Sequence, residues 1–345
     1  MSAEGSDGLS TLHPANFAMV MATGIVSIAA HLLGFASIGF GLFWLNLVFY
    51  CVLWTLTLLR IALYPRAVAA DFLHHGRTVG FFTTVAATCV LGSQCLVVAE
   101  SPRAALAFWI AGTSLFFALN YAIFTALTVK AAKPGLVEGL NGAWLLGVVA
   151  AQSVAVLGAQ LAPGLGAHAE GLLFFALVVW CAGCMLYVWI ISLIFYRYTF
   201  FPLSPSDLTP PYWVNMGAAA ISTLAGTLLI AAAPLSPLLS DLLPFLKGLT
   251  LLFWSTASWW IPMLVLLGIW RHVYSRFPIR YDPLYWGAVF PLGMYTTCTF
   301  RLAAAIDTPF LLVVSRTAVY IALAAWTAAF LGLAMHLLRA AFRPR

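Results

Sequence analysis

The sequence contains few charged residues. Asp, Glu, Lys and Arg together make up only 8% of its 345 residues, whereas a soluble globular domain carries about 25%. Hydrophobic residues account for 63% of the chain. This composition excludes a soluble enzyme and a disordered chain, and six cysteines are too few for a disulfide-rich scaffold. Apolar runs of about twenty residues recur along the chain, so the sequence predicts an integral membrane protein in contact with the lipid bilayer.

Blocks of basic residues and metal-ligand clusters are also scarce. Sixteen Lys and Arg give a net charge of +6, but they are scattered between apolar runs, which argues against a nucleic-acid partner. Cys181 and Cys184 form a C-x-x-C motif inside an apolar run, with no His or carboxylate close to it in sequence. We therefore predict no metal and no cofactor, and we expect the cysteines to act as small apolar side chains.

The apolar runs predict an all-α integral membrane protein with ten transmembrane helices, in which residues 14–339 form a single domain. Residues 1–13 are a short leader and residues 340–345 a tail. The leader lacks the basic residues of a signal peptide, so we expect the first span to remain in the protein. The predicted spans cover residues 14–36, 39–63, 78–99, 104–130, 141–161, 169–197, 212–233, 243–271, 283–304 and 310–338.

The basic residues predict the orientation of the chain. Twelve of the sixteen Lys and Arg lie at the ends of even-numbered spans, in the loops that follow those spans, or in the tail; the other four are Arg103, Lys247, Arg301 and Arg316. Lys and Arg are retained on the cytoplasmic side of a membrane. Both termini are therefore predicted to be cytoplasmic, in a multi-pass protein of the plasma membrane, or inner membrane in bacteria.

The odd-numbered spans begin at nearly even intervals, 63 to 71 residues apart. This spacing predicts five helical hairpins around a central pore, as repeats in transporters surround a path. The odd-numbered spans are also richer in hydroxyl, amide and glycine residues, so we expect them to form the inner ring. Close helix packing is the alternative explanation of these residues. The candidate pore-lining residues are Thr23, Gly24, Ser27, Thr84, Thr88, Asn141, Asn215, Ser222, Gly293 and Thr297.

The ninth span carries the sharpest candidate site. Pro291 lacks an N–H group and should bend the helix beside Phe290, so this ring is a candidate pore gate, with ordinary packing as the alternative. Arg301 follows eleven residues later, on the same helix face and roughly 16 Å further along the axis. It is a candidate to attract anions toward the outer side. The alternative is an ion pair with Asp307 or contact with the outer headgroups; Arg316 is the other candidate partner of Asp307.

Two of these segments resemble the tellurite-resistance/dicarboxylate transporter family, which includes fungal malate and sulfite transporters and plant slow anion channels. Residues 17–27 are similar to its opening F-x-x-x-M-x-T-G-I-x-S pattern, and Trp286 to Gly293 is similar to its pore-phenylalanine segment. The resemblance implies that Phe290 is the gate and that the protein is a homotrimer. The segment from Asp71 to His75 is also similar to a segment of this family, but His-His-Gly stands here where the family usually has His-Pro.

The sequence thus predicts transport of anions, either a C4-dicarboxylate such as malate or a small inorganic anion such as tellurite, sulfite, chloride or nitrate. No carboxylate lies in the middle of a span, which favours passive flux slightly over proton coupling. The alternative function is a membrane-embedded enzyme or metal-binding protein that uses His31, His74, His75 or the C-x-x-C motif. We expect no such activity, because His31 is predicted near the outer face and His74 and His75 near the inner one.

Overall fold

The computed structural model describes residues 8–279 and 281–342. Residues 1–7 of the predicted leader and residues 343–345 of the predicted tail lie outside the described residues. Three of the arginines counted for the orientation, Arg280, Arg343 and Arg345, lie outside them as well.

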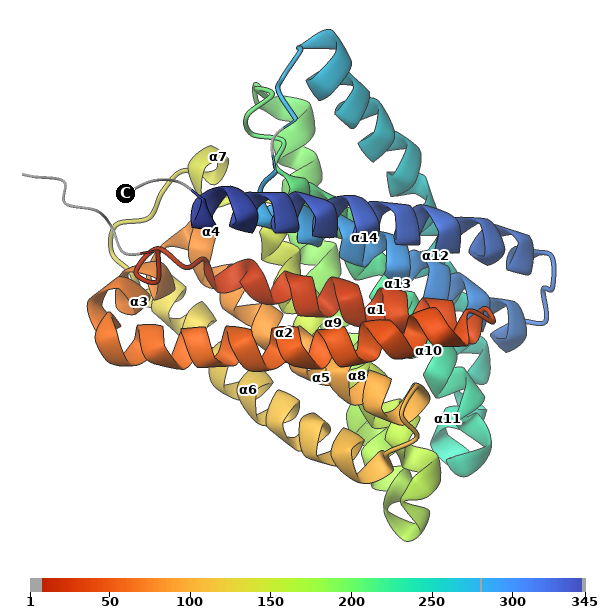
Figure 1. Ribbon diagram of the computed structural model, residues 1–345. Coiled ribbons are helices and arrows are strands. Elements are labelled where there is room, and N and C mark those ends of the chain that lie inside the picture. The colour runs from red at the N-terminus through yellow and green to blue at the C-terminus, as the bar shows by residue number, and fades with distance from the viewer. Residues whose placement is uncertain (1–7, 280, 343–345) are drawn as a thin grey trace, which may run out of the picture.

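Within the described ranges every regular element is helical (Figure 1). The elements of the first half are η1 (Pro14–Phe17), α1 (Ala18–Leu32), α2 (Ala36–Leu63), α3 (Pro65–Phe72), α4 (His75–Thr78), η2 (Val79–Phe81), α5 (Phe82–Val97), α6 (Pro102–Val129), α7 (Leu136–Gly139), η3 (Gly142–Leu145) and α8 (Leu146–Leu161). Those of the second half are η4 (Ala162–Gly164), η5 (Gly166–His168), α9 (Ala169–Phe200), η6 (Pro210–Trp213), α10 (Val214–Ala231), η7 (Ala233–Leu235), α11 (Pro237–Asp241), α12 (Leu243–Ile269), η8 (Trp270–Tyr274), η9 (Pro283–Tyr285), α13 (Trp286–Ala305) and α14 (Leu311–Ala341).

Nine helical segments of the described chain are long and apolar enough to cross a membrane. They match nine of the ten predicted spans, and α13, the predicted ninth span, is not among them. This helix carries three threonines, Pro291 and Arg301, which lower its hydropathy. Most of its side chains are nevertheless buried, because α13 packs against α1, α10, α12 and α14.

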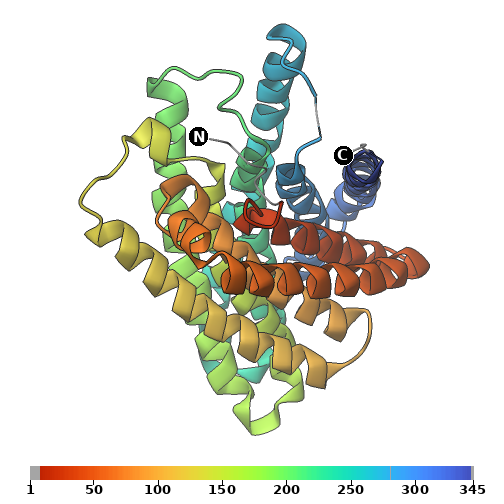
Figure 2. The ribbon, with the colours of Figure 1, turned by 60° about the vertical axis from the view of Figure 1, so that its left-hand side comes forward.

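The long helices fall into a buried set and an exposed set. The spans that contain α1, α5, α8 and α10 are 78–94% buried, whereas those of α2, α6, α9, α12 and α14 are only 22–44% buried. Helix α1 contacts α5 and α13, α5 contacts α8, and α10 contacts both α8 and α13. The five buried helices therefore form a closed inner ring, and the alternate helices cover it from outside (Figures 1 and 2).

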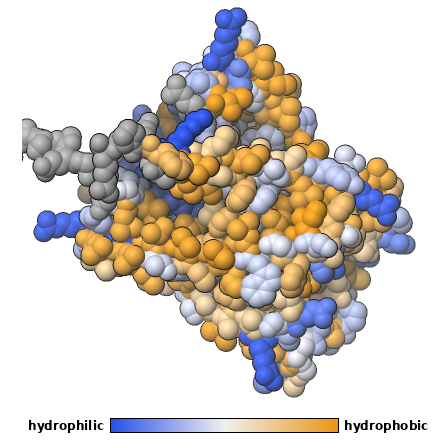
Figure 3. All heavy atoms as spheres, in the orientation of Figure 1, coloured by the Kyte–Doolittle hydropathy of each residue, from blue (hydrophilic) through white to orange (hydrophobic). Residues whose placement is uncertain are grey.

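The outer surface is apolar, as a lipid-facing surface should be. Trp44, Trp189, Leu252 and Leu266 are each more than half exposed on the outer helices. Figure 3 shows a broad hydrophobic face, with hydrophilic residues at its margins. Helices suit this setting because they satisfy their own backbone hydrogen bonds where no water is available.

Small residues allow the inner helices to approach closely. A Cβ atom on Gly217 of α10 would lie 2.7 Å from Cγ of Pro291, and one on Gly293 of α13 would lie 2.9 Å from Cγ2 of Ile25. The start of α1 and the end of α14 lie at the same end of this bundle, together with α3, α4 and α7 (Figure 1). We call this the inner end, because it carries the basic loops.

Candidate functional site

Two cavities lie inside the ring, and all five inner helices contribute to both. The inner cavity, of about 110 Å3, is lined by the beginnings of the five helices, including Ala18, Thr83, Leu146, Val214 and Gly287. The outer cavity, of about 20 Å3, is lined further along the same helices by residues that include Ile25, Val90, Ser153, Ile221 and Met294. A water molecule needs roughly 10–15 Å3 by this measure. The outer cavity therefore has room for about one water molecule and the inner one for several.

The linings of the two cavities are in register on every inner helix. The five residues of the inner cavity named above precede the five of the outer cavity by seven positions each, as from Gly287 to Met294. Seven residues are close to two helical turns, so both residues of each pair point to the same side. The ring axis therefore passes from one cavity to the other, through a level one turn beyond the inner cavity.

Small side chains dominate this intermediate level. The positions four residues after the inner-cavity set are Ala22, Ala87, Ala150, Ala218 and Pro291. The preceding positions are Met21, Ala86, Val149, Gly217 and Phe290. Phe290 has the largest side chain of these ten and is 1% exposed. Phe290 is therefore the largest residue at this level of the ring.

The inner cavity is lined by helix N-termini. Four of the five inner helices begin with a side chain that accepts a hydrogen bond from a backbone N–H: His13 from Ala15, His74 from Gly76, Asn141 from Ala143, and Asp282 from Leu284. The fifth begins at Thr209, directly before η6. Unpaired N–H groups and the helix dipole make an N-terminus partially positive. Five of them around one cavity create a field that attracts anions.

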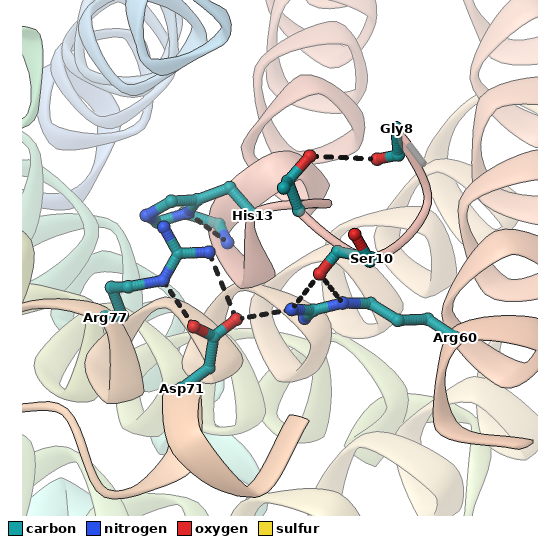
Figure 4. Close-up of polar contacts among 8 residues, drawn as sticks. Gly8, Ser10, His13, Arg60, Asp71 and Arg77 are labelled. Carbon is teal, nitrogen blue, oxygen red and sulfur yellow. Dashed lines mark hydrogen bonds and ion pairs between the residues drawn. The ribbon is translucent and has the colours of Figure 1, made fainter. Parts of the chain in front are cut away.

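Three charged side chains beside the inner cavity, Arg60, Asp71 and Arg77, are paired with one another (Figure 4). Asp71 of α3 accepts hydrogen bonds from Arg77 and from Arg60, which is 4% exposed and also donates to the carbonyl of Ser10 at 2.9 Å. Burial opposes ionisation of Asp71, but the two arginines outweigh it and lower the pKa of the carboxyl below its usual value. His13 lies next to this cluster, and burial followed by the charge of Arg77 lowers its pKa to about 4. His13 is therefore neutral at pH 7.

The outer cavity contains an unpaired cation. Arg301 of α13 lines it together with Ser93, Ser153, Gln160 and Thr297. In the described part of the chain no hydrogen bond or ion pair joins its guanidinium to another residue, because the three ion pairs found there involve Arg60, Arg77 and Arg197. Neither Arg301 nor Arg316 therefore pairs with Asp307. A guanidinium surrounded by hydroxyls and an amide offers hydrogen-bond donors to an anion.

Three of the residues predicted to line a pore contribute to these cavities: Asn141 to the inner one, and Thr297 and Arg301 to the outer one. Phe290 and Pro291 lie between the cavities along α13. The predicted residues are thus brought together mainly on the ninth span.

Other predicted residues of α1, and Gly293 of α13, lie at helix contacts. Thr23 accepts a hydrogen bond from Nε1 of Trp326 on α14 at 3.0 Å. The hydroxyl of Ser27 donates to the carbonyl of Gly39 on α2 at 2.6 Å. Gly24 faces α2 and α5, and Gly293 faces α1.

The predicted residues of α5 and α10 bond mainly within their own helices. The hydroxyls of Thr84, Thr88 and Ser222 donate to backbone carbonyls three or four residues earlier. Asn215 is buried near Tyr187, whose hydroxyl donates to its backbone carbonyl at 3.0 Å. Helix packing thus accounts for part of the polar pattern in the odd-numbered spans.

Two features of the cavities were missed by the sequence reasoning. The alanines at the intermediate level do not stand out in an apolar helix. The even spacing of the odd-numbered spans nevertheless aligns them with Phe290. Ser93 and Ser153 belong to the polar residues of the third and fifth spans but were not among the candidate pore-lining residues, and Gln160 was not singled out at all. For the alternative function, no group of three His, Cys, Asp or Glu residues that could hold a metal ion occurs among the described residues. His31 lies at the far end of α1 from His74 and His75.

Helical membrane proteins whose central helices enclose polar cavities include channels and transporters. The family model described as SLAC1, voltage-dependent anion channel, matches residues 11–334, and the chain belongs to this family. A sulfite efflux pump of Arthroderma benhamiae is 25% identical over 325 residues, which cover 88% of this chain and 84% of that protein. An uncharacterized transporter of Methanocaldococcus jannaschii is 26% identical over 82% of each chain. An uncharacterized membrane protein of Mycobacterium tuberculosis is 43% identical over 154 residues, which cover 44% of this chain and 77% of that one.

Proposed function

We propose that the protein conducts small monovalent anions along the axis of its inner ring, and that the side chain of Phe290 is the gate. The observation that carries this proposal is the pair of cavities, each lined by all five inner helices, with Phe290 at the level between them. Family membership supports an anion as the transported species. Rotation of one aromatic side chain would join the two cavities without rearranging the ring.

The charge in the outer cavity favours a monovalent substrate. Arg301 is the basic side chain in the outer cavity lining, and a C4-dicarboxylate such as malate would be better matched by two cations. Chloride, nitrate and hydrogensulfite each need only one. Hydroxyl and amide dipoles around a single guanidinium also bind weakly enough to allow rapid release, which conduction requires.

The proposal includes α13 as a tenth membrane-crossing helix and places both termini in the cytoplasm. Helix α13 lies within the ring and shares its contacts with other helices, so it does not need the hydropathy of a lipid-facing span. The inner end carries the basic loops, as expected of the cytoplasmic side of a plasma membrane or bacterial inner membrane. The homotrimer implied by the family resemblance is part of the same proposal.

The test of the gate is anion flux into proteoliposomes containing the native protein or Phe290→Ala. Removing the ring should raise chloride flux by at least about tenfold, which corresponds to a barrier lower by about 1.4 kcal/mol. Phe253→Ala is the matched control, because Phe253 is 3% exposed but lies on the outer helix α12. It should destabilise the protein to a similar extent without raising flux.

Two results would contradict the proposal in different ways. Equal flux in Phe290→Ala and the native protein, or an equal rise in both variants, would remove Phe290 as the gate. Comparing chloride, nitrate, hydrogensulfite and malate in the open variant tests the substrate class separately. If malate passes fastest, the path stands but its preference for monovalent anions does not.

A further inference from the structure

A third cavity lies outside the ring, near the inner end, between α12 and α13. It has a volume of about 280 Å3 and is bounded by Leu264, Gly268, Arg271, His272, Tyr285 and Ala288. The last turns of α12 and the π-helical segment η8 project beyond the neighbouring helices in Figures 1 and 2. Such π-helical turns occur frequently at functional sites. The cavity lies beside the inner cavity of the ring, and Thr209 lines both.

The wall of this cavity is divided into an apolar and a basic part. Leu264, Gly268 and Ala288 lie on the parts of α12 and α13 within the bundle, whereas Arg271 and His272 lie in η8, which follows α12. Arg271 donates one hydrogen bond through Nη1 to the carbonyl of Leu208, and its Nε is buried with no acceptor. Because a buried donor without an acceptor is costly, the arginine has capacity for an anionic partner.

His272 supplies a second polar contact of different character. Its Nδ1 lies 2.9 Å from the carbonyl oxygen of Phe277, and because a carbonyl can only accept, Nδ1 carries the proton. The other ring nitrogen, Nε2, is therefore an acceptor in the neutral imidazole. The two side chains together complement a group that combines a negative charge with a hydroxyl.

The surrounding charge and exposure indicate where such a group would come from. No Asp or Glu occurs between Asp241 and Asp282 in the sequence, so this segment is purely basic. Val273, Tyr274 and Ile279 are each at least 70% exposed, which is typical of residues in contact with lipid. Basic pockets between helices at the cytoplasmic side of a membrane are suited to anionic lipid headgroups.

We infer that this cavity binds one anionic phospholipid of the leaflet at the inner end. Its phosphate contacts Arg271, a headgroup hydroxyl contacts His272, and the upper part of an acyl chain lies along Gly268 between α12 and α13. Bound there, the lipid would fill the space beside the beginning of α13, the helix that carries Phe290.

The test uses the full-length protein in detergent, with phosphatidylglycerol as the probe and phosphatidylcholine as the neutral comparison. Native mass spectrometry should show one phosphatidylglycerol retained per chain, and added phosphatidylglycerol should raise the Tm more than phosphatidylcholine does. Arg271→Gln removes the charge and should weaken retention about tenfold, as expected for loss of a hydrogen bond to a charged group. Gly268→Leu should weaken it without removing any polar group, because a Cβ there meets no atom within 4 Å.

Matched controls separate this site from general attraction to the surface. Arg276→Gln removes the same charge from an exposed position five residues away, and Gly41→Leu adds the same side chain to an exposed, open position on α2. Both should retain the lipid as the native protein does. Equal retention of the two lipids, an equal loss in Arg276→Gln, unchanged binding in both cavity variants, or displacement of the lipid by inorganic phosphate alone would each overturn the inference. None of these results bears on the gate, which is tested by flux.

Discussion

The two cavities along the ring axis present positive potential in different ways. At the inner cavity, five helix N-termini supply backbone dipoles, and the nearby arginines are paired with Asp71. At the outer cavity, the positive charge belongs to the unpaired side chain of Arg301. The inner field is therefore distributed over many peptide groups, whereas the outer field depends on a single residue. Replacing one charged side chain should therefore change the field less at the inner cavity than at the outer cavity.

The largest effect is expected on stability, from Asp71→Asn at the inner end. This change leaves Arg60, whose side chain is 5% exposed, without its countercharge. Loss of one partner of a buried ion pair costs about 3–5 kcal/mol, and the bond from Arg60 to Ser10 should reduce this to the lower end. The Tm in detergent should fall clearly, whereas Asp241→Asn, at an exposed position of α11, should leave it unchanged. An unchanged Tm in both variants would show that the cluster does not hold the inner end together.

The next effect is on anion permeation, from Arg301→Gln. Without this charge the outer cavity keeps only neutral dipoles, so chloride flux in the open Phe290→Ala background should fall about tenfold, a loss of roughly 1.4 kcal/mol. Arg301→Lys should retain most of the flux. The matched change at the other end, Arg77→Gln, should have a smaller effect, because that guanidinium is already paired with Asp71 and the helix N-termini remain.

Equal reductions in Arg301→Gln and Arg77→Gln would contradict the proposed difference between the two cavities. They would indicate that net charge along the axis matters and its position does not. If Arg301→Gln leaves chloride flux unchanged, Arg301 does not act on permeating anions. It is then a cation that contacts the outer headgroups, which the sequence analysis gave as an alternative.

The hydropathy of the chain predicted the fold well, because lipid and protein surroundings demand different side chains. Aromatic, apolar segments such as residues 169–197 could be assigned to the outside, and the polar, glycine-containing spans to the ring. The contacts of individual side chains could not be predicted with the same success from the sequence. Thr23 and Ser27 have the same polar groups as Thr297 but bond to α14 and α2, since the direction of a hydroxyl depends on helix rotation. Phe290 and Arg301 were chosen as candidates because proline and arginine are conspicuous in a span.

The smallest effect is expected from the pH at the inner cavity. His13 has a pKa lowered from 6.5 to about 4 by burial and by Arg77, with Asp71, Asp282 and Arg60 also facing it. Folding therefore favours the neutral form of His13. The contribution of this residue to the free energy of unfolding is present above pH 6.5 and is lost as the pH falls through 4. Protonation also adds positive charge beside the five N-termini. Chloride entry from the inner side should therefore rise by about two- to threefold as the pH is lowered from 7 to 4.

Chloride is the suitable ion for this measurement, because its own charge is constant over this range. His13→Asn is the matched control, since asparagine can cap a helix but does not titrate. Its flux should stay flat with pH, and its value should match that of the native protein at pH 7. If His13→Asn shows the same rise, another group at the inner end titrates. The inner field would then depend on side-chain charge, as the outer one does, more than on the helix N-termini.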